Sequence, residues 1–112
     1  MMNCFINRKE VQVNTETKNV KGYHLLSEKQ GCVKGCCSGI NYVYMEEYSS
    51  PGVHDDQEGF LVLEGTGWAK VGGEEFRLEP DVCFLAAKGV AHCMKKAPGV
   101  EYLKVFWFHA AV

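Results

Sequence analysis

The chain has 112 residues, enough for one hydrophobic core and one domain but not for two. Hydrophobic residues make up 46% and charged residues 23%, which is ordinary composition for a soluble globular protein. The formal net charge is -2, so no basic excess favours binding to a phosphate backbone. We therefore expect no nucleic-acid partner.

The N-terminal segment MMNCFINRKE lacks the apolar run of a signal peptide, and no segment approaches the ~20 apolar residues that cross a bilayer. We expect a cytoplasmic protein with no membrane partner. Six cysteines in that compartment are expected to be reduced thiols. Three of them lie in GCVKGCCSG, residues 31–39, which resembles half of a zinc site but lacks a second pair of ligands.

Residues 1–38 show no clear period, and any helix there must be short. We assign residues 1–37 to N-terminal strands or to a cover over the barrel that residues 38–109 form. Seven short segments follow with turn signals between them, and this pattern predicts an all-β sandwich or barrel within a single domain, 1–112. The expected strands are 39–48, 59–64, 66–71, 74–79, 82–87, 89–96 and 100–108.

The last of these segments, VEYLKVFWF, is apolar on both faces. Leu103, Val105 and Trp107 share one face, and Phe106 and Phe108 share the other. A half-exposed strand should alternate apolar and polar residues, so this one is either central or covered. A barrel has one interior, so the other face predicts a homodimer, unless the N-terminal residues fold over it.

The stretch PGVHDDQEGFLVLEGTG, residues 51–67, places several possible ligands just before an apolar strand. Counting in twos puts Glu58, Phe60 and Val62 on one face, and His54 shares that face if the chain is extended. A later strand offers His92 with Met94 on its own face. If the sheet curls, His54, Glu58 and His92 converge, and two histidines with one carboxylate suit a divalent first-row metal.

These residues resemble the motifs of the cupin family. His54-x3-Glu58-x6-Gly65 reproduces the second histidine, the glutamate and the closing glycine of the first motif, and Gly89 and His92 keep the spacing of the second. Ala87 and Lys96 replace the proline and asparagine expected there. The resemblance covers residues 38–109. It implies a double-stranded β-helix, which is a jelly-roll barrel, and a pairing of barrels through their outer sheets.

The family's first histidine falls on Gly52, which has no side chain to donate. The resemblance therefore implies three metal ligands, His54, Glu58 and His92. Asp56 or Gln57 is a possible additional ligand. Three ligands with water can hold zinc, iron, manganese or nickel. We expect Phe60, Val62 and Met94 to line the cavity.

Other polar residues have simpler interpretations. His24 and His109 are expected to be structural or exposed, because an isolated histidine in a strand is more often packed than a ligand. Asp55 and Asp56 favour turns through local hydrogen bonds, so a turn role competes with ligation for Asp56.

Two functions remain in competition. In the first, a metal held by His54, Glu58 and His92 serves a protein that acts on or binds a small organic molecule. In the second, a metal-free module binds a small ligand such as a sugar or an organic acid without catalysis. The absent first histidine favours the second. A structural protein with a decayed site is a third interpretation, and the retained ligand spacing opposes it.

Overall fold

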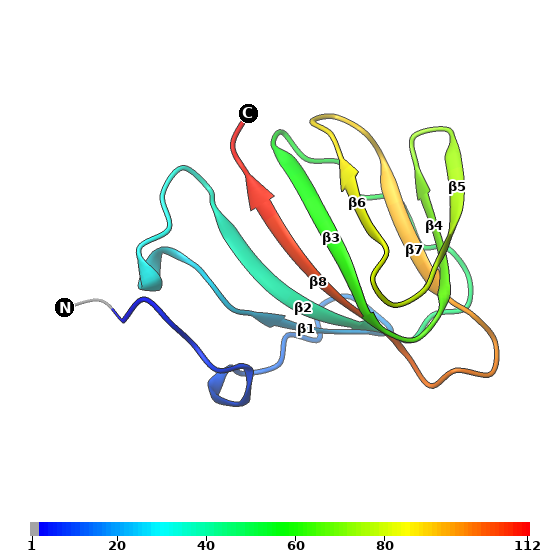
Figure 1. Cartoon of the computed structure of the whole chain (residues 1–112), viewed down its shortest axis with the longest axis horizontal. Helices are drawn as coiled ribbons and strands as arrows, with labels where there is room; N and C mark the ends of the chain where they lie inside the picture. The colour runs from blue at the N-terminus through cyan, green and yellow to red at the C-terminus, as the bar shows by residue number, and fades with distance from the viewer. Residues whose placement is uncertain (1–2) are drawn as a thin grey trace.

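Two antiparallel sheets make up the molecule in the computed structural model, which describes residues 3–112; the first two residues of the predicted N-terminal segment lie outside the described part (Figure 1). The five-stranded sheet has the order β1 (Val20–His24), β2 (Cys37–Val43), β8 (Leu103–Ala110), β3 (Gln57–Glu64) and β6 (Cys83–Ala86). The three-stranded sheet has the order β5 (Glu74–Leu78), β4 (Gly67–Val71) and β7 (His92–Lys96). Two 3-10 turns, η1 (Arg8–Glu10) and η2 (Glu28–Gln30), precede β2. The predicted all-β class is confirmed.

The core lies between the two sheets and follows the strand alternation. Leu103, Val105 and Trp107 point inward from β8, so this face of the last strand fills the interior. Phe60 and Val62 do the same from β3. The remaining buried apolar residues are Val43, Ala69, Leu78 and Ala86.

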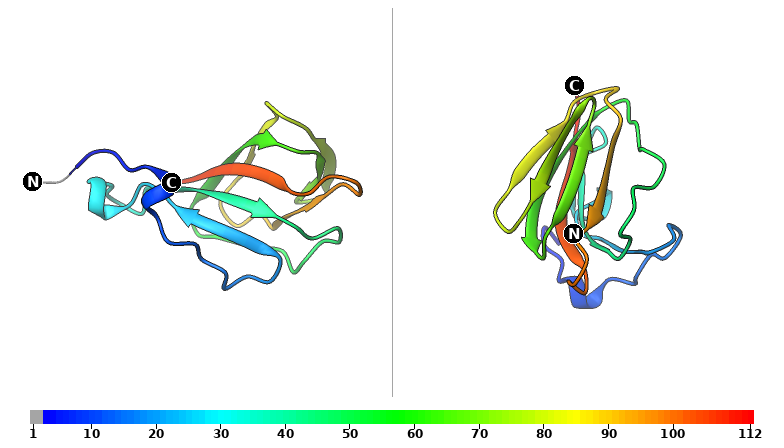
Figure 2. Two further views of the ribbon diagram at one scale, coloured as in Figure 1. Left: turned by 90° about the horizontal axis from the view of Figure 1, so that it is seen from below. Right: turned by 90° about the vertical axis from the view of Figure 1, so that its right-hand side faces the viewer.

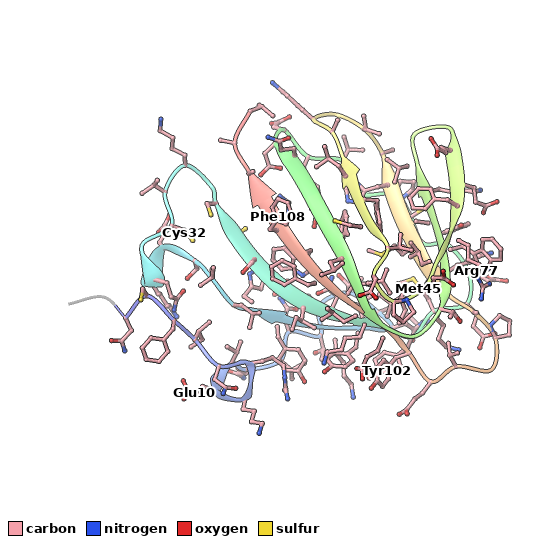
Figure 3. The ribbon with its side chains drawn as sticks, viewed as in Figure 1. Glu10, Cys32, Met45, Arg77, Tyr102 and Phe108 are labelled. Atoms are coloured by element: carbon pink, nitrogen blue, oxygen red, sulfur yellow. The ribbon has the colours of Figure 1, made fainter. Side chains whose placement is uncertain are left out.

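The outer face of the five-stranded sheet remains apolar and partly exposed. Leu63 is 37% exposed, Leu85 50% and Phe108 39%. Phe108 is labelled on β8 in Figure 3. Residues 3–37 do not cover this surface. Their strand β1 extends the sheet at its edge by pairing with β2, and Figure 2 shows this segment along one side of the molecule.

The strand predicted over residues 39–48 ends at Val43, because the chain then crosses from one sheet to the other. The Tyr44 amide donates to the Asn19 carbonyl at 2.8 Å, and the Lys96 amide of β7 donates to the Met45 carbonyl at 2.9 Å. These bonds replace a ladder with β8. The crossing leads the chain into the loop 49–56, which carries His54 to the open end between the sheets.

A close approach at Gly39 positions the indole of Trp107. A Cβ at this position would lie 2.3 Å from Trp107 Cζ2, so only glycine lets the ring lie across β2. The indole Nε1 donates to Asn41 Oδ1 at 3.1 Å. Trp107 thereby forms part of the wall of the interior. Nowhere in residues 3–112 is there a helix of the length and hydrophobicity that a membrane span requires.

Candidate metal centre

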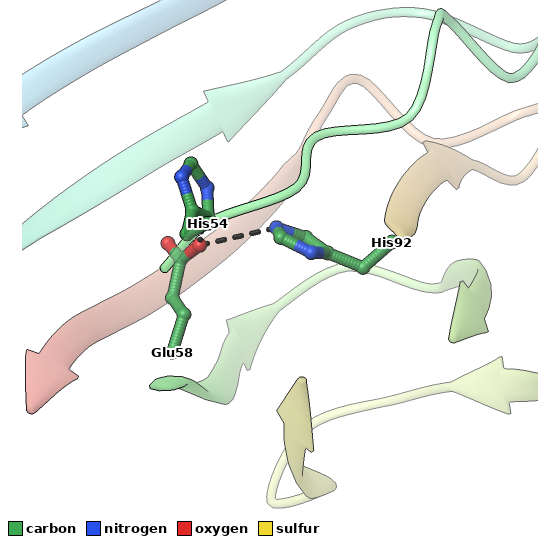
Figure 4. Close-up of side chains that lie close together, drawn as sticks. All are labelled: His54, Glu58 and His92. Atoms are coloured by element: carbon green, nitrogen blue, oxygen red, sulfur yellow. Dashed lines mark ion pairs between the residues drawn. The ribbon is translucent and has the colours of Figure 1, made fainter. Parts of the chain in front are cut away.

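Three side chains from separate segments meet at the open end of the interior (Figure 4). Glu58 lies at the start of β3, His92 begins β7, and His54 lies in the loop before β3. The Nε2 atoms of His54 and His92 lie 3.2 Å and 3.1 Å from the same oxygen, Oε1 of Glu58. One donor atom from each of the three lies within 4.8 Å of the others.

Backbone pairing brings the two sequence motifs together. Gly52 and His92 form an isolated antiparallel bridge, in which each amide donates to the other's carbonyl at 2.9 Å and 3.0 Å. The Gly89 amide donates to the His54 carbonyl at 2.9 Å. The loop of the first motif is therefore tied to the strand of the second, and the imidazoles are held near Glu58 by main-chain contacts.

Gly52 faces this cluster directly. A Cβ at this position would lie 3.5 Å from His92 Nε2 and 3.6 Å from His54 Nε2, which is ordinary van der Waals contact. Gly52 is not among the residues with positive φ, so its backbone is open to other residue types. The missing side chain leaves one side of the cluster open.

His109 joins the cluster, although its isolated position in the sequence favours a structural or exposed role. Its Nε2 lies 3.3 Å from Glu58 Oε2, and its ring centroid lies 5.0 Å from that of His54. The residue faces Glu58 across the β3–β8 ladder. The sequence indicates the direction of this side chain. Counting in twos along β8 puts His109 on the same face as Leu103, Val105 and Trp107, which fill the interior.

The other residues named from the sequence lie around this centre. The Asp56 carboxylate accepts from His109 Nδ1 at 3.0 Å, whereas the Gln57 amide turns away and donates to the Ala111 carbonyl at 2.9 Å. Phe60 and Met94 line the cavity. Val62 does not: it is 1% exposed and packs in the core, since it lies two residues deeper along β3 than Phe60.

A cavity of about 430 Å³ opens onto the cluster. Its inner wall includes Phe60, Met94 and Trp107. Its polar lining residues include Asn14, Glu16, Thr17, Asn41, Ser49 and Ser50. His24 lies on this wall as well, edge-on to Trp107 with ring centroids 5.2 Å apart. The cavity therefore combines an apolar inner wall with many polar groups, and it is large enough for a small organic molecule.

Polar contacts hold the cluster together. Glu58 is buried at 8% exposure, and a buried carboxylate needs partners of opposite charge or hydrogen-bond donors. The hydrogen bond to Glu58 raises the pKa of His92, although burial opposes this shift. The hydrogen bond from His109 lowers the pKa of Asp56 despite partial desolvation.

The donor set fits a divalent first-row metal. Two imidazole nitrogens and one carboxylate oxygen are ligands for such ions, and atoms bound at about 2.0–2.2 Å to one ion lie roughly 3 Å apart in adjacent positions. The separations of 3.1 Å and 3.2 Å agree with this. His92 Nδ1 faces the Val90 carbonyl at 3.3 Å, a contact that holds the ring with Nε2 toward Glu58 and is of the kind that orients metal-binding histidines.

The cysteines take no part in this centre. All six are free thiols, and the metal-capable group found among residues 3–112 contains none of them. The segment with Cys32, Cys36 and Cys37 runs through the loop after η2 into the start of β2.

Comparison with protein families gives a match to the cupin domain over residues 43–109, and the chain belongs to this family. The match spans both metal-site motifs, and it also includes His109. A comparison with curated proteins gives no match.

Solved structures share the fold over nearly the whole chain. The polyketide cyclase RemF from Streptomyces resistomycificus superposes with a TM-score of 0.80 at 17% identity, over 97% of this chain and 79% of its own. An RmlC-like cupin from Shewanella frigidimarina gives 0.79 at 13% identity, over 96% and 90%.

Hydroxypropylphosphonic acid epoxidase from S. wedmorenis gives 0.83 at 17% identity, over 95% of this chain and 58% of its own. The present chain thus spans little more than half of the epoxidase. At these identities the likeness shows the jelly-roll cupin fold alone.

Proposed function

We propose that the protein binds a divalent first-row metal through His54, Glu58 and His92 and that it acts on or binds a small organic molecule in the adjoining cavity. The convergence of two imidazole nitrogens on one buried carboxylate oxygen carries this proposal. Without a cation, Glu58 would depend on the histidines alone to offset its buried charge.

Each residue of the proposed site has a separate role. When bound, the ion supplies Lewis-acid or redox chemistry to an oxygen-bearing ligand. His54 and His92 bind through Nε2, and Glu58 balances the charge. Gly52 leaves one side open, toward which a ligand can approach. Phe60 and Met94 exclude water from the inner wall, while the polar lining residues orient the organic molecule.

Zinc, iron, manganese and nickel all suit two imidazoles and one carboxylate. Structures of the epoxidase with Fe(II) support iron among these candidates, since that protein shares this fold. Its chain is longer than this one, and its substrate does not carry over to the present cavity.

The test begins with protein stripped of metal by a chelator and reloaded with each ion, with Fe(II) handled without oxygen. Elemental analysis should give about one ion per chain, and titration calorimetry should give the affinity. His54→Ala and His92→Ala should each weaken binding strongly. His24→Ala is the matched control, because His24 lines the same cavity outside the cluster. Native protein that takes up no ion after reloading would overturn the proposal.

The competing function, metal-free binding of a sugar or organic acid, is favoured by one observation: Gly52 supplies no imidazole where the family's first histidine falls. Thermal melting of metal-free protein with a panel of sugars and small carboxylic acids separates the two functions. Stabilisation that persists in chelator and in the His92→Ala variant would support the metal-free module.

We also propose a homodimer formed through the outer face of the five-stranded sheet. Leu63, Leu85 and Phe108 are all more than a third exposed on this face, and contiguous apolar surface of this kind drives association. Sedimentation equilibrium should give a dimer. Leu85→Lys should yield monomer, whereas Val33→Lys, at an exposed site in the loop before β2, should not. A native monomer at high micromolar concentration would exclude this interface.

A further inference from the structure

We infer that His109, held by Asp56, is a positioning residue of the metal centre: it fixes Oε2 of Glu58 so that Oε1 faces His54 and His92. This inference rests on the proposed metal-binding function. It assigns a role to the third imidazole of the cluster and to the aspartate behind it.

The strand register places His109 at Glu58. The two residues are direct Cα partners in the antiparallel β3–β8 ladder, where opposite side chains on one face are neighbours. His109 also pairs with Cys37 of β2 on its other side, so its backbone is held in the middle of the sheet. Its side chain is 16% exposed and that of Glu58 10%. The contact is therefore built into the fold.

Both ring nitrogens of His109 face carboxylate oxygens. Nδ1 lies 3.0 Å and 3.1 Å from the two oxygens of Asp56, and Nε2 lies 3.3 Å from Glu58 Oε2. The Asp56 oxygens only accept hydrogen bonds, so Nδ1 of His109 donates to Asp56, and this bond holds the ring with Nε2 beside Glu58 Oε2. Asp56 fixes the ring orientation, and the ring in turn fixes the carboxylate of Glu58.

The two oxygens of Glu58 are divided between different partners. Oε1 faces His54 and His92, whereas Oε2 faces His109. His109 is not a member of the group whose donor atoms lie within 4.8 Å of one another. This arrangement assigns His109 to the orientation of a ligand rather than to the ligand set. Outer partners of this kind typically contribute about 10- to 100-fold to metal affinity.

His109 also supports the most exposed ligand. Its ring meets that of His54 edge to face, with centroids 5.0 Å apart and planes at 80°. It also contacts Trp107, with centroids 5.5 Å apart. The His54 side chain is 41% exposed and lies in a loop, so the packed ring of His109 limits where it can go.

The experiment uses the full chain loaded with Cu(II), whose pulsed electron paramagnetic resonance counts the imidazoles bound to the ion. Native protein should show two. His109→Ala should weaken Cu(II) and Zn(II) binding about 10- to 100-fold and still show two. His109→Gln should recover most of the affinity, because the glutamine amide can donate near the position of Nε2. Circular dichroism checks that each variant is folded.

Asp56→Asn should lose part of the affinity, and its exposed neighbour in Asp55→Asn is the matched control. Three bound imidazoles in native protein that fall to two in His109→Gln would overturn the positioning role in favour of direct ligation. Unchanged affinity in a folded His109→Ala would also overturn it. Native protein that binds neither ion would instead overturn the proposed function itself, so the two failures are distinct.

Discussion

The candidate metal centre has a fixed side and an open side, and they are built differently. On the fixed side, Glu58, His92 and His109 lie on paired strands, and their side chains are 10–16% exposed. The ring nitrogens Nδ1 of His92 and His109 face oxygen acceptors. On the open side, His54 comes from a loop with its side chain 41% exposed, and Gly52 contributes no side chain.

The difference shows how the site can hold its donor atoms in place and still admit a ligand. Sites built on strands hold their geometry better than sites on loops, so the fixed side sets the positions of the donor atoms. The open side leaves room for a ligand to reach them. Variants on the fixed side should therefore lower metal affinity, whereas variants on the open side should change both the metal affinity and what else can bind.

The strongest way to break the fixed side is Glu58→Gln. This change keeps the size of the side chain but removes the negative charge that both Nε2 atoms face. We expect metal affinity to fall by at least about 100-fold, more than the loss of an outer partner costs. Competition with a chelator measures it. Glu64→Gln, on the same strand but exposed, should bind like native protein, and equal loss in both variants would contradict the role of Glu58.

The next largest effect on metal affinity should come from filling the open side. Gly52→His should tighten metal binding by about tenfold or more, equivalent to about 1.4 kcal/mol, because the new side chain starts beside both Nε2 atoms without backbone strain. It should also block small anions such as azide from the loaded centre, as visible absorption spectra would show. Gly52→Ala is the control: it fills part of the open side without supplying a metal ligand, so metal affinity should stay near the native value. Equal or weaker affinity in a folded Gly52→His would refute this geometry.

Acid should weaken the fixed side. The pKa of His92 is raised by its hydrogen bond to Glu58, and metal binding requires the neutral imidazole. Protons therefore compete with the ion up to a higher pH than for an ordinary histidine with pKa 6.5. Zn(II) affinity measured from pH 5.5 to 8 should fall steadily toward acid and begin to fall above pH 6.5. An affinity that is flat across this range would contradict the raised pKa.

The smallest expected effect concerns the folding stability of the metal-free protein. This stability should rise toward acid, whereas the metal affinity should fall. A folded-state pKa above the unfolded value adds stability that is fully present below the unfolded pKa and lost as pH rises through the folded one. The Glu58–His92 contact should therefore make metal-free protein slightly more stable at pH 6 than at pH 8. Urea unfolding at the two values measures it, and His92→Gln should reduce the difference. A native difference of the reverse sign would contradict this.

Much of the strand pattern could be predicted from the sequence. Apolar alternation between glycine and proline turns located β3 to β8, because period two is a strong local signal. It did not show that residues 44–48 leave the sheet, since the crossing depends on hydrogen bonds to Asn19 and Lys96, distant in the sequence. Strand β1 was also not located, because VKGYH has little apolar periodicity and is fixed by its pairing with β2.

The residues of the candidate site could be predicted where they follow the spacing of the family motifs. His54, Glu58 and His92 follow family spacing, and the structure brings them together. His109 was missed because it stands alone in the sequence, and its contact depends on the β3–β8 register. Val62 was placed in the cavity by parity alone, which gives the face of a strand but not the depth along it.

The position of Trp107 should make its fluorescence sensitive to whether a metal ion is bound. The centroid of its indole lies 5.5 Å from that of the His109 ring, and the indole lines the cavity, so its fluorescence is emitted beside the candidate metal centre. The second tryptophan, Trp68, lies on β4 beneath the guanidinium of Arg77, in the other sheet. Paramagnetic ions quench excited indoles at short range, whereas Zn(II) does not. Loading with Cu(II) or Fe(II) should therefore quench the fluorescence of Trp107 more strongly than that of Trp68, which does not line the cavity, and this allows occupancy to be followed in native protein without a label.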